Sequence, residues 1–142
     1  MPDRDCLFCR IAAGEEDAAI VLDEPQALAF LDHRPLFHGH CLLITRPHRS
    51  TLLDLAPEEI GPFFASAQQL ARAVTESMDA EGTFVALNNV VSQSVPHLHV
   101  HVVPRRRKDG LRGFFWPRTK YEIAEQEVEV AAAVREVVSR LA

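Results

Sequence analysis

Apolar residues recur at helical spacing in three parts of the chain. Residues 6–13 carry apolar side chains on one face and end at a glycine, which predicts a short helix. Residues 60–78 predict a long helix. Because Pro62 is unfavourable deep inside a helix, we expect a short turn first and a main helix that begins near Gly61. Residues 121–141 predict a last amphipathic helix.

Apolar runs of strand length fill most of the remainder. They occupy residues 19–22, 27–31, 41–45, 83–87 and 98–103. The first two predict a hairpin, and Pro104 is expected to end the last strand. Because strands come in runs and do not alternate strictly with helices, we expect an α+β fold with a mainly antiparallel five-stranded sheet. Such a sheet packs one face on a helix and leaves the other available to a ligand.

Length and composition are those of one globular domain, which we expect to span residues 1–142. The chain is 47% hydrophobic and 25% charged, and none of its apolar runs approaches the roughly 20 residues that cross a bilayer. Its polar first residues do not have the pattern of a signal peptide. We therefore expect a cytoplasmic protein that does not associate with membranes.

Charge is unevenly distributed along the chain. The net charge of −5 argues against broad electrostatic binding to nucleic acid or to an acidic membrane. A basic stretch nevertheless follows residue 104, with Arg105, Arg106, Arg107, Lys108, Arg112, Arg118 and Lys120. It is either a solvated loop or a local attractor for an anionic ligand.

Histidines alternate with apolar residues at His97, His99 and His101. Side chains two residues apart on a strand share a face, so we predict three imidazoles about 6–7 Å apart along it. Leu98 and Val100 would point the other way, into the core. Three imidazoles in register are not explained by packing, and they indicate one of two chemistries. Either they bind a catalytic metal with an open position for water, or one imidazole is a nucleophile that its neighbours orient.

Polar residues before this strand favour the nucleophile. Gln93 and Ser94 offer amide and hydroxyl donors at the edge of the histidine face, which suit phosphate oxygens. The three cysteines do not form a disulfide framework, and Cys41 is expected to be a buried small hydrophobe. Cys6 and Cys9 form a C-x-x-C pair, which alone is ambiguous among zinc binding, redox chemistry and coincidence.

The segment from Gln93 to Val103 resembles the signature of the histidine triad superfamily, in which histidines alternate with apolar residues after Gln-Ser or Gln-Thr. The resemblance extends in the same order to residues 6–11, 29–32 and 39–48, and it covers about residues 6 to 104. The Hint-type branch is the most similar. Residues 105–142 are then an extension of the kind that varies within the family.

This resemblance implies a nucleotide hydrolase that works through a nucleotidyl-histidine. His99 matches the nucleophile that attacks the α-phosphate of a nucleoside phosphoramidate or polyphosphate. Gln93, Ser94 and His101 match the donors to phosphate oxygens, with His101 also acting on the leaving group. His40 resembles the residue that orients the nucleophile. No catalytic metal is required for this mechanism.

The resemblance also implies how a purine nucleotide is bound. Asp32 matches the carboxylate that accepts hydrogen bonds from both ribose hydroxyls. An apolar slot for the base is matched by Leu7, Phe8, Ile11, Phe30 and Leu31. His33 stands where relatives often have an aliphatic residue, and Asn88 or Asn89 is within reach of the ribose or phosphate. The stretch from these asparagines to Gln93 is shorter than in many relatives and lacks their glycines.

Zinc and a homodimer follow from the same resemblance. His48 and His97 complete a structural zinc site with Cys6 and Cys9, which removes His97 from catalysis. Relatives form dimers whose sheets join and whose long helices pack together, so we expect a homodimer, with Trp116-Pro117 and the last helix near the partner's site.

Three other functions fit the same residues. They are a nucleotide-binding regulatory protein with little turnover, a metalloenzyme that uses the three histidines, and a nucleotidyl transferase or phosphorylase that releases the nucleotide to phosphate.

Overall fold

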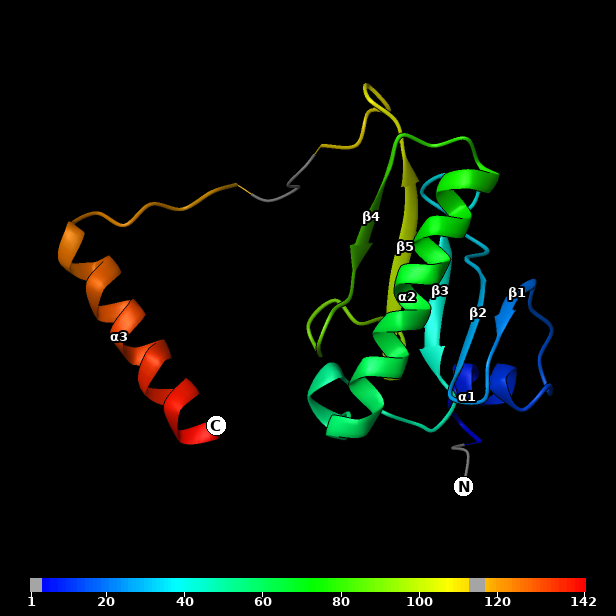
Figure 1. Ribbon diagram of the computed structural model, residues 1–142, viewed down its shortest axis with the longest axis horizontal. Helices are drawn as coiled ribbons and strands as arrows, with labels where there is room; N and C mark the ends of the chain where they lie inside the picture. The colour runs from blue at the N-terminus through cyan, green and yellow to red at the C-terminus, as the bar shows by residue number, and fades with distance from the viewer. Residues whose placement is uncertain (1–3, 113–116) are drawn as a thin grey trace. The chain divides into compact units, whose positions relative to one another are not determined.

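The fold is seen in a computed structural model that describes residues 4–112 and 117–142. Its sheet has five strands, β1 (Ile20–Asp23), β2 (Ala27–Leu31), β3 (Cys41–Thr45), β4 (Gly82–Ala86) and β5 (His99–Arg105). They are ordered β1-β2-β3-β5-β4, and every neighbouring pair is antiparallel (Figure 1). The predicted α+β class and the five-stranded antiparallel sheet are confirmed.

Three helices accompany the sheet. They are α1 (Leu7–Ala12), α2 (Pro57–Ser77) and α3 (Ala124–Leu141), with a short 3-10 turn η1 (Leu52–Asp54) before α2. The chain divides into two compact units, residues 1–109 and residues 110–142, and the sheet belongs to the first. In the second unit α3 buries none of its residues. None of the described helices is long and apolar enough to pass through a bilayer.

Two predictions based on prolines are wrong. Helix α2 begins at Pro57 and runs through Pro62 without a break. The carbonyl that Pro62 leaves without an amide partner belongs to the exposed Glu58, where solvent replaces the lost hydrogen bond. Likewise β5 does not stop before Pro104 but continues to Arg105. Its pairing with β3 ends at Val102, so a residue without an N–H is tolerated beyond that point.

Each face of the sheet packs against a different helix. On one face, strand residues such as Leu43 and Val100 pack against Phe63 and Leu70 of α2. On the other, Phe30, Leu42 and Ile44 pack against α1. Figure 1 shows α2 lying across the sheet and α1 beside its lower end. The alternation of β5 puts Val100 and Val102 under α2, and its histidines therefore project on the α1 side.

Candidate active site and metal centre

A pocket of about 480 Å³ opens on the α1 side of the sheet. Its walls come from α1, from the segment before β1, from the end of β2 and from β5. The predicted residues that line it are Leu7, Phe8, Ile11, Phe30, Leu31, Asp32, His33, Ser94, His99 and His101. This volume is within the range of small-molecule sites, and most of its wall is apolar, with a few polar groups at one end.

A backbone carbonyl holds the imidazole of His99. Its Nδ1 lies 2.7 Å from the carbonyl oxygen of His97. Because a carbonyl oxygen only accepts, Nδ1 carries the proton, and in the neutral ring the lone pair is on Nε2. Phe8 packs edge-on against the ring, with 5.1 Å between centroids. His99 thus has a fixed orientation at the pocket wall, with Nε2 as its free basic nitrogen.

A series of hydrogen bonds from Leu36 through His40 sets the tautomer of His101. The backbone N–H of Leu36 donates to Nδ1 of His40 at 3.1 Å, so His40 carries its proton on Nε2. This Nε2 lies 3.0 Å from Nδ1 of His101 and donates to it. His101 therefore keeps its own proton on Nε2. The prediction that His40 orients the nucleophile differs from this geometry, because His40 contacts His101 while the His97 carbonyl orients His99.

Gly39 allows His40 to reach this position. Its φ of +98° is left-handed, and a Cβ at this residue would lie 2.6 Å from Cγ of Met78. A side chain there would push the segment away from the end of α2, and with it His40, which is buried.

Burial lowers the pKa of three of these imidazoles. Loss of solvation is the largest cause for His97 and His101, and it lowers the pKa of each to about 4. Loss of solvation also lowers the pKa of His40, although the negative charge of Asp32 opposes the change. All three rings are therefore neutral near pH 7, as the tautomers above require.

Gln93 and the two asparagines lie outside the pocket wall, unlike their predicted positions. Nε2 of Gln93 donates to the Ser50 carbonyl at 2.6 Å, and its Oε1 accepts from the backbone N–H of Val90. Oδ1 of Asn89 accepts from the backbone N–H of Leu52, and Nδ2 of Asn88 donates to the Ser92 carbonyl. These amides brace the loop before β5, and Ser94 is the residue of that loop that lines the pocket.

The same loop turns without glycine. Val90 and Ser92 have φ angles of +69° and +63°. Left-handed backbone costs a residue with a side chain roughly 1–2 kcal/mol, and the cost is higher for a β-branched residue such as valine. The hydrogen bond from the Val90 N–H to Gln93 helps to hold this conformation. The loop therefore turns with residues other than glycine in left-handed conformations, and hydrogen bonds with side-chain amides hold this strained backbone in place.

The four predicted zinc ligands converge where α1 begins. Nδ1 of His97 lies 3.4 Å from Sγ of Cys6 and 3.5 Å from Sγ of Cys9, and Nδ1 of His48 lies 3.2 Å from Sγ of Cys9. The four ligand atoms are all within 4.8 Å of one another. Tetrahedral zinc with ordinary bond lengths separates sulfur and nitrogen ligands by about 3.5 Å, so the spacing fits this ion.

The protonation of His97 fits a metal as well. Its Nε2 lies 2.7 Å from the carbonyl oxygen of Thr45 and donates to it, which leaves the Nδ1 lone pair directed at the sulfur atoms. Metal-binding histidines usually donate their second N–H in this way. Cys6, Cys9 and His97 are buried, so thiolates and an imidazole without an ion would be poorly compensated there.

A second group of ligand types, Asp32, His40 and His101, also lies within 4.8 Å. Here the protonation argues against a metal. A metal on Nε2 of His40 requires a proton on Nδ1, and that proton would oppose the N–H of Leu36 3.1 Å away. The group is better described as hydrogen-bonded imidazoles beside a carboxylate.

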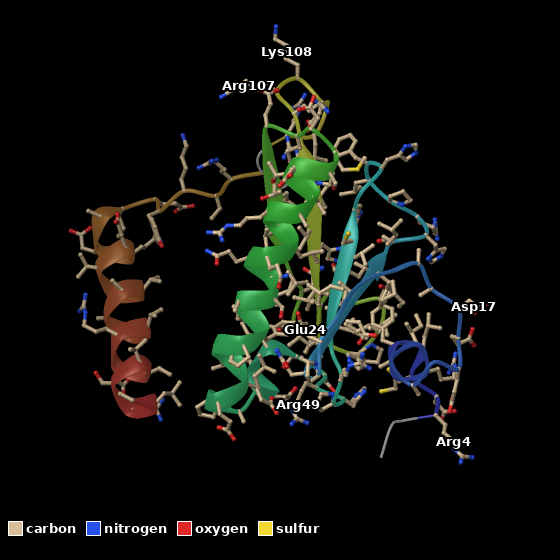
Figure 2. All side chains as sticks on the ribbon, turned by 45° about the vertical axis from the view of Figure 1, so that its right-hand side comes forward. Arg4, Asp17, Glu24, Arg49, Arg107 and Lys108 are labelled. Atoms are coloured by element: carbon tan, nitrogen blue, oxygen red, sulfur yellow. The ribbon has the colours of Figure 1, made fainter. Side chains whose placement is uncertain are left out.

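The first three arginines of the basic stretch, Arg105 to Arg107, bind neighbouring residues. Arg105 forms an ion pair with Asp109, Arg107 forms one with Glu81, and Arg106 donates to the Met78 carbonyl. Arg107 and Lys108 lie at the tip of the loop after β5, at the end of the sheet away from α1 (Figure 2). Arg105 is six residue steps along β5 from His99, about 20 Å. Arg105, Arg106 and Arg107 therefore do not supply cations to the pocket.

Sequence reasoning missed several residues of the site. Asp17, Ala18, Ala19, Leu42 and Val95 also line the pocket. Leu42 was predictable, because it pairs with His101 across β3 and β5. Asp17 to Ala19 were not, since no periodicity marks the segment before β1, and only the hydrogen bond from the Leu31 N–H to the Ala19 carbonyl places it there. Trp116 lies outside the described residues.

The chain is similar in sequence and in structure to known proteins. The model of the HIT domain matches residues 13–108. An uncharacterized HIT-like protein of Mycobacterium tuberculosis is 38% identical over 108 residues, which cover 75% of each chain. An adenosine 5'-monophosphoramidase of Schizosaccharomyces pombe is 30% identical over 126 residues, 87% of this chain and 90% of that protein. The crystal structure of a zinc-bound histidine triad family protein from Mycobacterium smegmatis is 34% identical, with a TM-score of 0.71 and coverage of 95% and 96%.

Proposed function

This chain belongs to the HIT family, and on that premise we propose that it is a hydrolase that cleaves at the α-phosphate of a purine nucleoside phosphoramidate or dinucleoside polyphosphate. The observation that carries the proposal is the hydrogen bond from Nδ1 of His99 to the His97 carbonyl, 2.7 Å long. It leaves a basic nitrogen on a ring of fixed orientation at the wall of the pocket.

The lining of the pocket supports one placement of the nucleotide. The base lies among the apolar side chains of α1 and β2. Asp32, whose side chain is only 16% exposed, accepts hydrogen bonds from the ribose hydroxyls. The α-phosphate then lies at the end formed by Ser94, His99 and His101, since this end carries the donors and the nucleophile.

In the first step Nε2 of His99 attacks the α-phosphorus and the bond to the leaving group breaks; an amine departs as the neutral molecule from the N-protonated phosphoramidate, and a phosphate group departs as the anion. The positive charge that develops on the imidazole is stabilised through Nδ1–H by the His97 carbonyl. Nε2–H of His101, which the chain from Leu36 and His40 fixes as a donor, contacts the phosphoryl oxygens or the leaving group. Water then cleaves the bond between His99 and phosphorus, which releases the nucleoside monophosphate.

The other functions are supported less well by the same site. A metalloenzyme built on the histidines is disfavoured by the tautomer of His40 and by the contacts of His97 with two cysteines. A transferase to phosphate gains no support from Arg105 and Arg107, which form ion pairs at the far end of β5 from His99. A regulatory protein with little turnover uses the same residues, so only turnover separates it from a hydrolase.

A panel of nucleoside phosphoramidates, dinucleoside polyphosphates and sugar nucleotides tests the proposal. We expect steady-state release of nucleoside monophosphate from at least one class of substrate. Rapid quenching without acid should trap a nucleotidyl group on the chain, which mass spectrometry then detects. Binding of nucleoside monophosphates without turnover of any substrate would instead identify a regulatory protein.

Replacement of Asp32 by Asn should weaken binding of the ribose. We expect KM to rise about tenfold, since a charge-assisted pair of hydrogen bonds is replaced by weaker neutral ones. The comparison uses a substrate and its 2',3'-dideoxy analogue. In the wild type the analogue should bind more weakly than the substrate. In Asp32→Asn the analogue and the substrate should bind about equally. If removal of the ribose hydroxyls weakens binding by the same factor in both proteins, the ribose does not contact Asp32.

We also propose that Cys6, Cys9, His48 and His97 hold a structural zinc ion. Two thiolates and two imidazoles form the closed tetrahedral set that such sites use, and the ion would supply a cross-link between α1 and the segment before β5. The name of the Mycobacterium smegmatis relative supports zinc in this family.

A homodimer is the third part of the proposal. Strand β4 is an edge of the sheet, and Val85 on β4 and Ile60 and Phe64 on α2 are exposed apolar residues. An exposed edge strand next to apolar helix residues suits pairing with a second copy.

We expect Phe64→Glu to convert the dimer to a monomer in light scattering coupled to gel filtration, because it places a charge in the apolar interface. Gln69→Glu is the control, since Gln69 is exposed on the same helix about 140° further around it. A wild type that is monomeric at micromolar concentration, or dissociation by both variants, would contradict this interface.

A further inference from the structure

Asp17 is the charged residue in the base half of the pocket. Apart from His33, which follows β2, the other residues there are apolar, from α1, from Ala18 and Ala19, and from the end of β2. The Ala19 carbonyl accepts from the Leu31 N–H at 3.0 Å, so the segment that carries Asp17 runs beside the wall of the slot. Figure 2 shows Asp17 at the outer edge of the molecule, on the segment that passes α1. It therefore lies at the open rim, where the edge of a bound base emerges.

The surroundings of Asp17 leave its carboxylate available to a ligand. Within residues 4–112 and 117–142, the neighbouring Glu16 forms an ion pair with Arg10, whereas no ion pair involves Asp17. Asp17 is exposed, so solvent hydrates its carboxylate, and the lack of an ion pair costs little free energy in the unbound protein. An ionised carboxylate is an acceptor only, with two oxygens side by side.

This chemistry distinguishes between the purine bases. The Watson–Crick edge of guanine presents two donors, N1–H and N2–H, which match the two oxygens of a carboxylate. The same edge of adenine presents one donor beside the acceptor N1, whose lone pair a carboxylate repels. The apolar slot stacks either base equally well, so the selection has to come from the polar group at its rim.

We propose that Asp17 makes this site selective for guanine over adenine by accepting hydrogen bonds from N1–H and N2–H. The inference rests on the proposed binding of a purine nucleotide in this pocket. It adds a specificity that the family membership does not provide, since the apolar slot alone does not tell the two bases apart.

Equilibrium binding of GMP, IMP and AMP to the full chain tests it without any turnover. We expect GMP to bind about fivefold to tenfold more tightly than AMP, the range for a charge-assisted hydrogen bond that solvent partly screens. IMP keeps N1–H but lacks the N2 amine, so its affinity should lie between the two.

Two variants of Asp17 and one control complete the experiment. Asp17→Ala should bring the ratio of affinities close to one. Asp17→Asn presents an acceptor beside a donor, which matches adenine, and it should reverse the preference toward AMP. Glu15→Ala removes the same charge two residues away, outside the pocket lining, and should keep the wild-type ratio.

The outcomes separate the two proposals. Equal affinity of the wild type for GMP and AMP, or an unchanged ratio in Asp17→Ala and Asp17→Asn, overturns the role of Asp17 while nucleotide binding stands. No measurable binding of any of the three nucleotides overturns the proposed function itself.

Discussion

Replacement of His99 by Ala should reduce kcat on a nucleoside phosphoramidate by about 10⁴-fold or more, the scale of loss when a covalent nucleophile is removed. Neither of the other two histidines of the alternating run is placed to substitute for it. His97 directs its Nδ1 at two cysteines, and His101 presents a proton and not a lone pair to the pocket. Affinity for the nucleoside monophosphate product should change little, because His99 occupies only one end of the pocket.

A matched control distinguishes chemistry from folding. His38 is an exposed histidine close to His40 in the sequence and outside the nucleotide pocket, so His38→Ala should keep wild-type kcat. The trapped nucleotidyl group should be absent from His99→Ala and present in His38→Ala. Substantial turnover by a correctly folded His99→Ala protein would show that the nucleophile is another group.

The fold could be predicted well where one periodicity dominates. The run of residues 41–45 was assigned as a buried strand, and β3 is buried at all five positions. The hairpin of β1 and β2 was found because polar residues separate two short apolar runs. Prolines were overestimated as signals of termination, since Pro62 and Pro104 lie at positions where the missing hydrogen bond is not required by the fold.

The candidate site could be predicted as a set of residues but not as a set of contacts. Alternation along β5 is enough to put His99 and His101 on one face. It does not tell which ring nitrogen carries the proton, because that depends on the Leu36 N–H and the His97 carbonyl, which no pattern of side chains identifies. The contacts of Gln93 with Ser50 and Val90 depend in the same way on how a loop folds back.

Removal of zinc should destabilise the protein and also impair the proposed active site. We expect about one zinc ion per chain, and chelation should lower Tm by about 10 °C. The estimate corresponds to a loss of about 3 kcal/mol in a domain of this size. The physical reason is the burial of Cys6, Cys9 and His97, whose polar atoms would lose their common partner.

The effect on activity should follow from the backbone of His97. Its side chain is held by Thr45 and by the proposed ion, while its carbonyl orients His99. Loosening this residue disturbs the nucleophile without touching the pocket lining, so kcat should fall more than KM rises when zinc is removed, and zinc addition should restore both Tm and kcat.

Variants of the cysteines test which residues bind the ion. Replacement of Cys6 and Cys9 by Ser should yield a chain without zinc and with the lowered Tm of the chelated wild type. Cys41 is the control, because it packs in the core under α2, where burial raises the pKa of its thiol to about 11. Cys41→Ser should retain one zinc ion per chain even though a buried hydroxyl lowers its stability.

If the purified wild type holds no zinc and chelation leaves Tm unchanged, the four residues form a hydrogen-bonded cluster and not a metal site. The orientation of His99 would then depend on those hydrogen bonds alone.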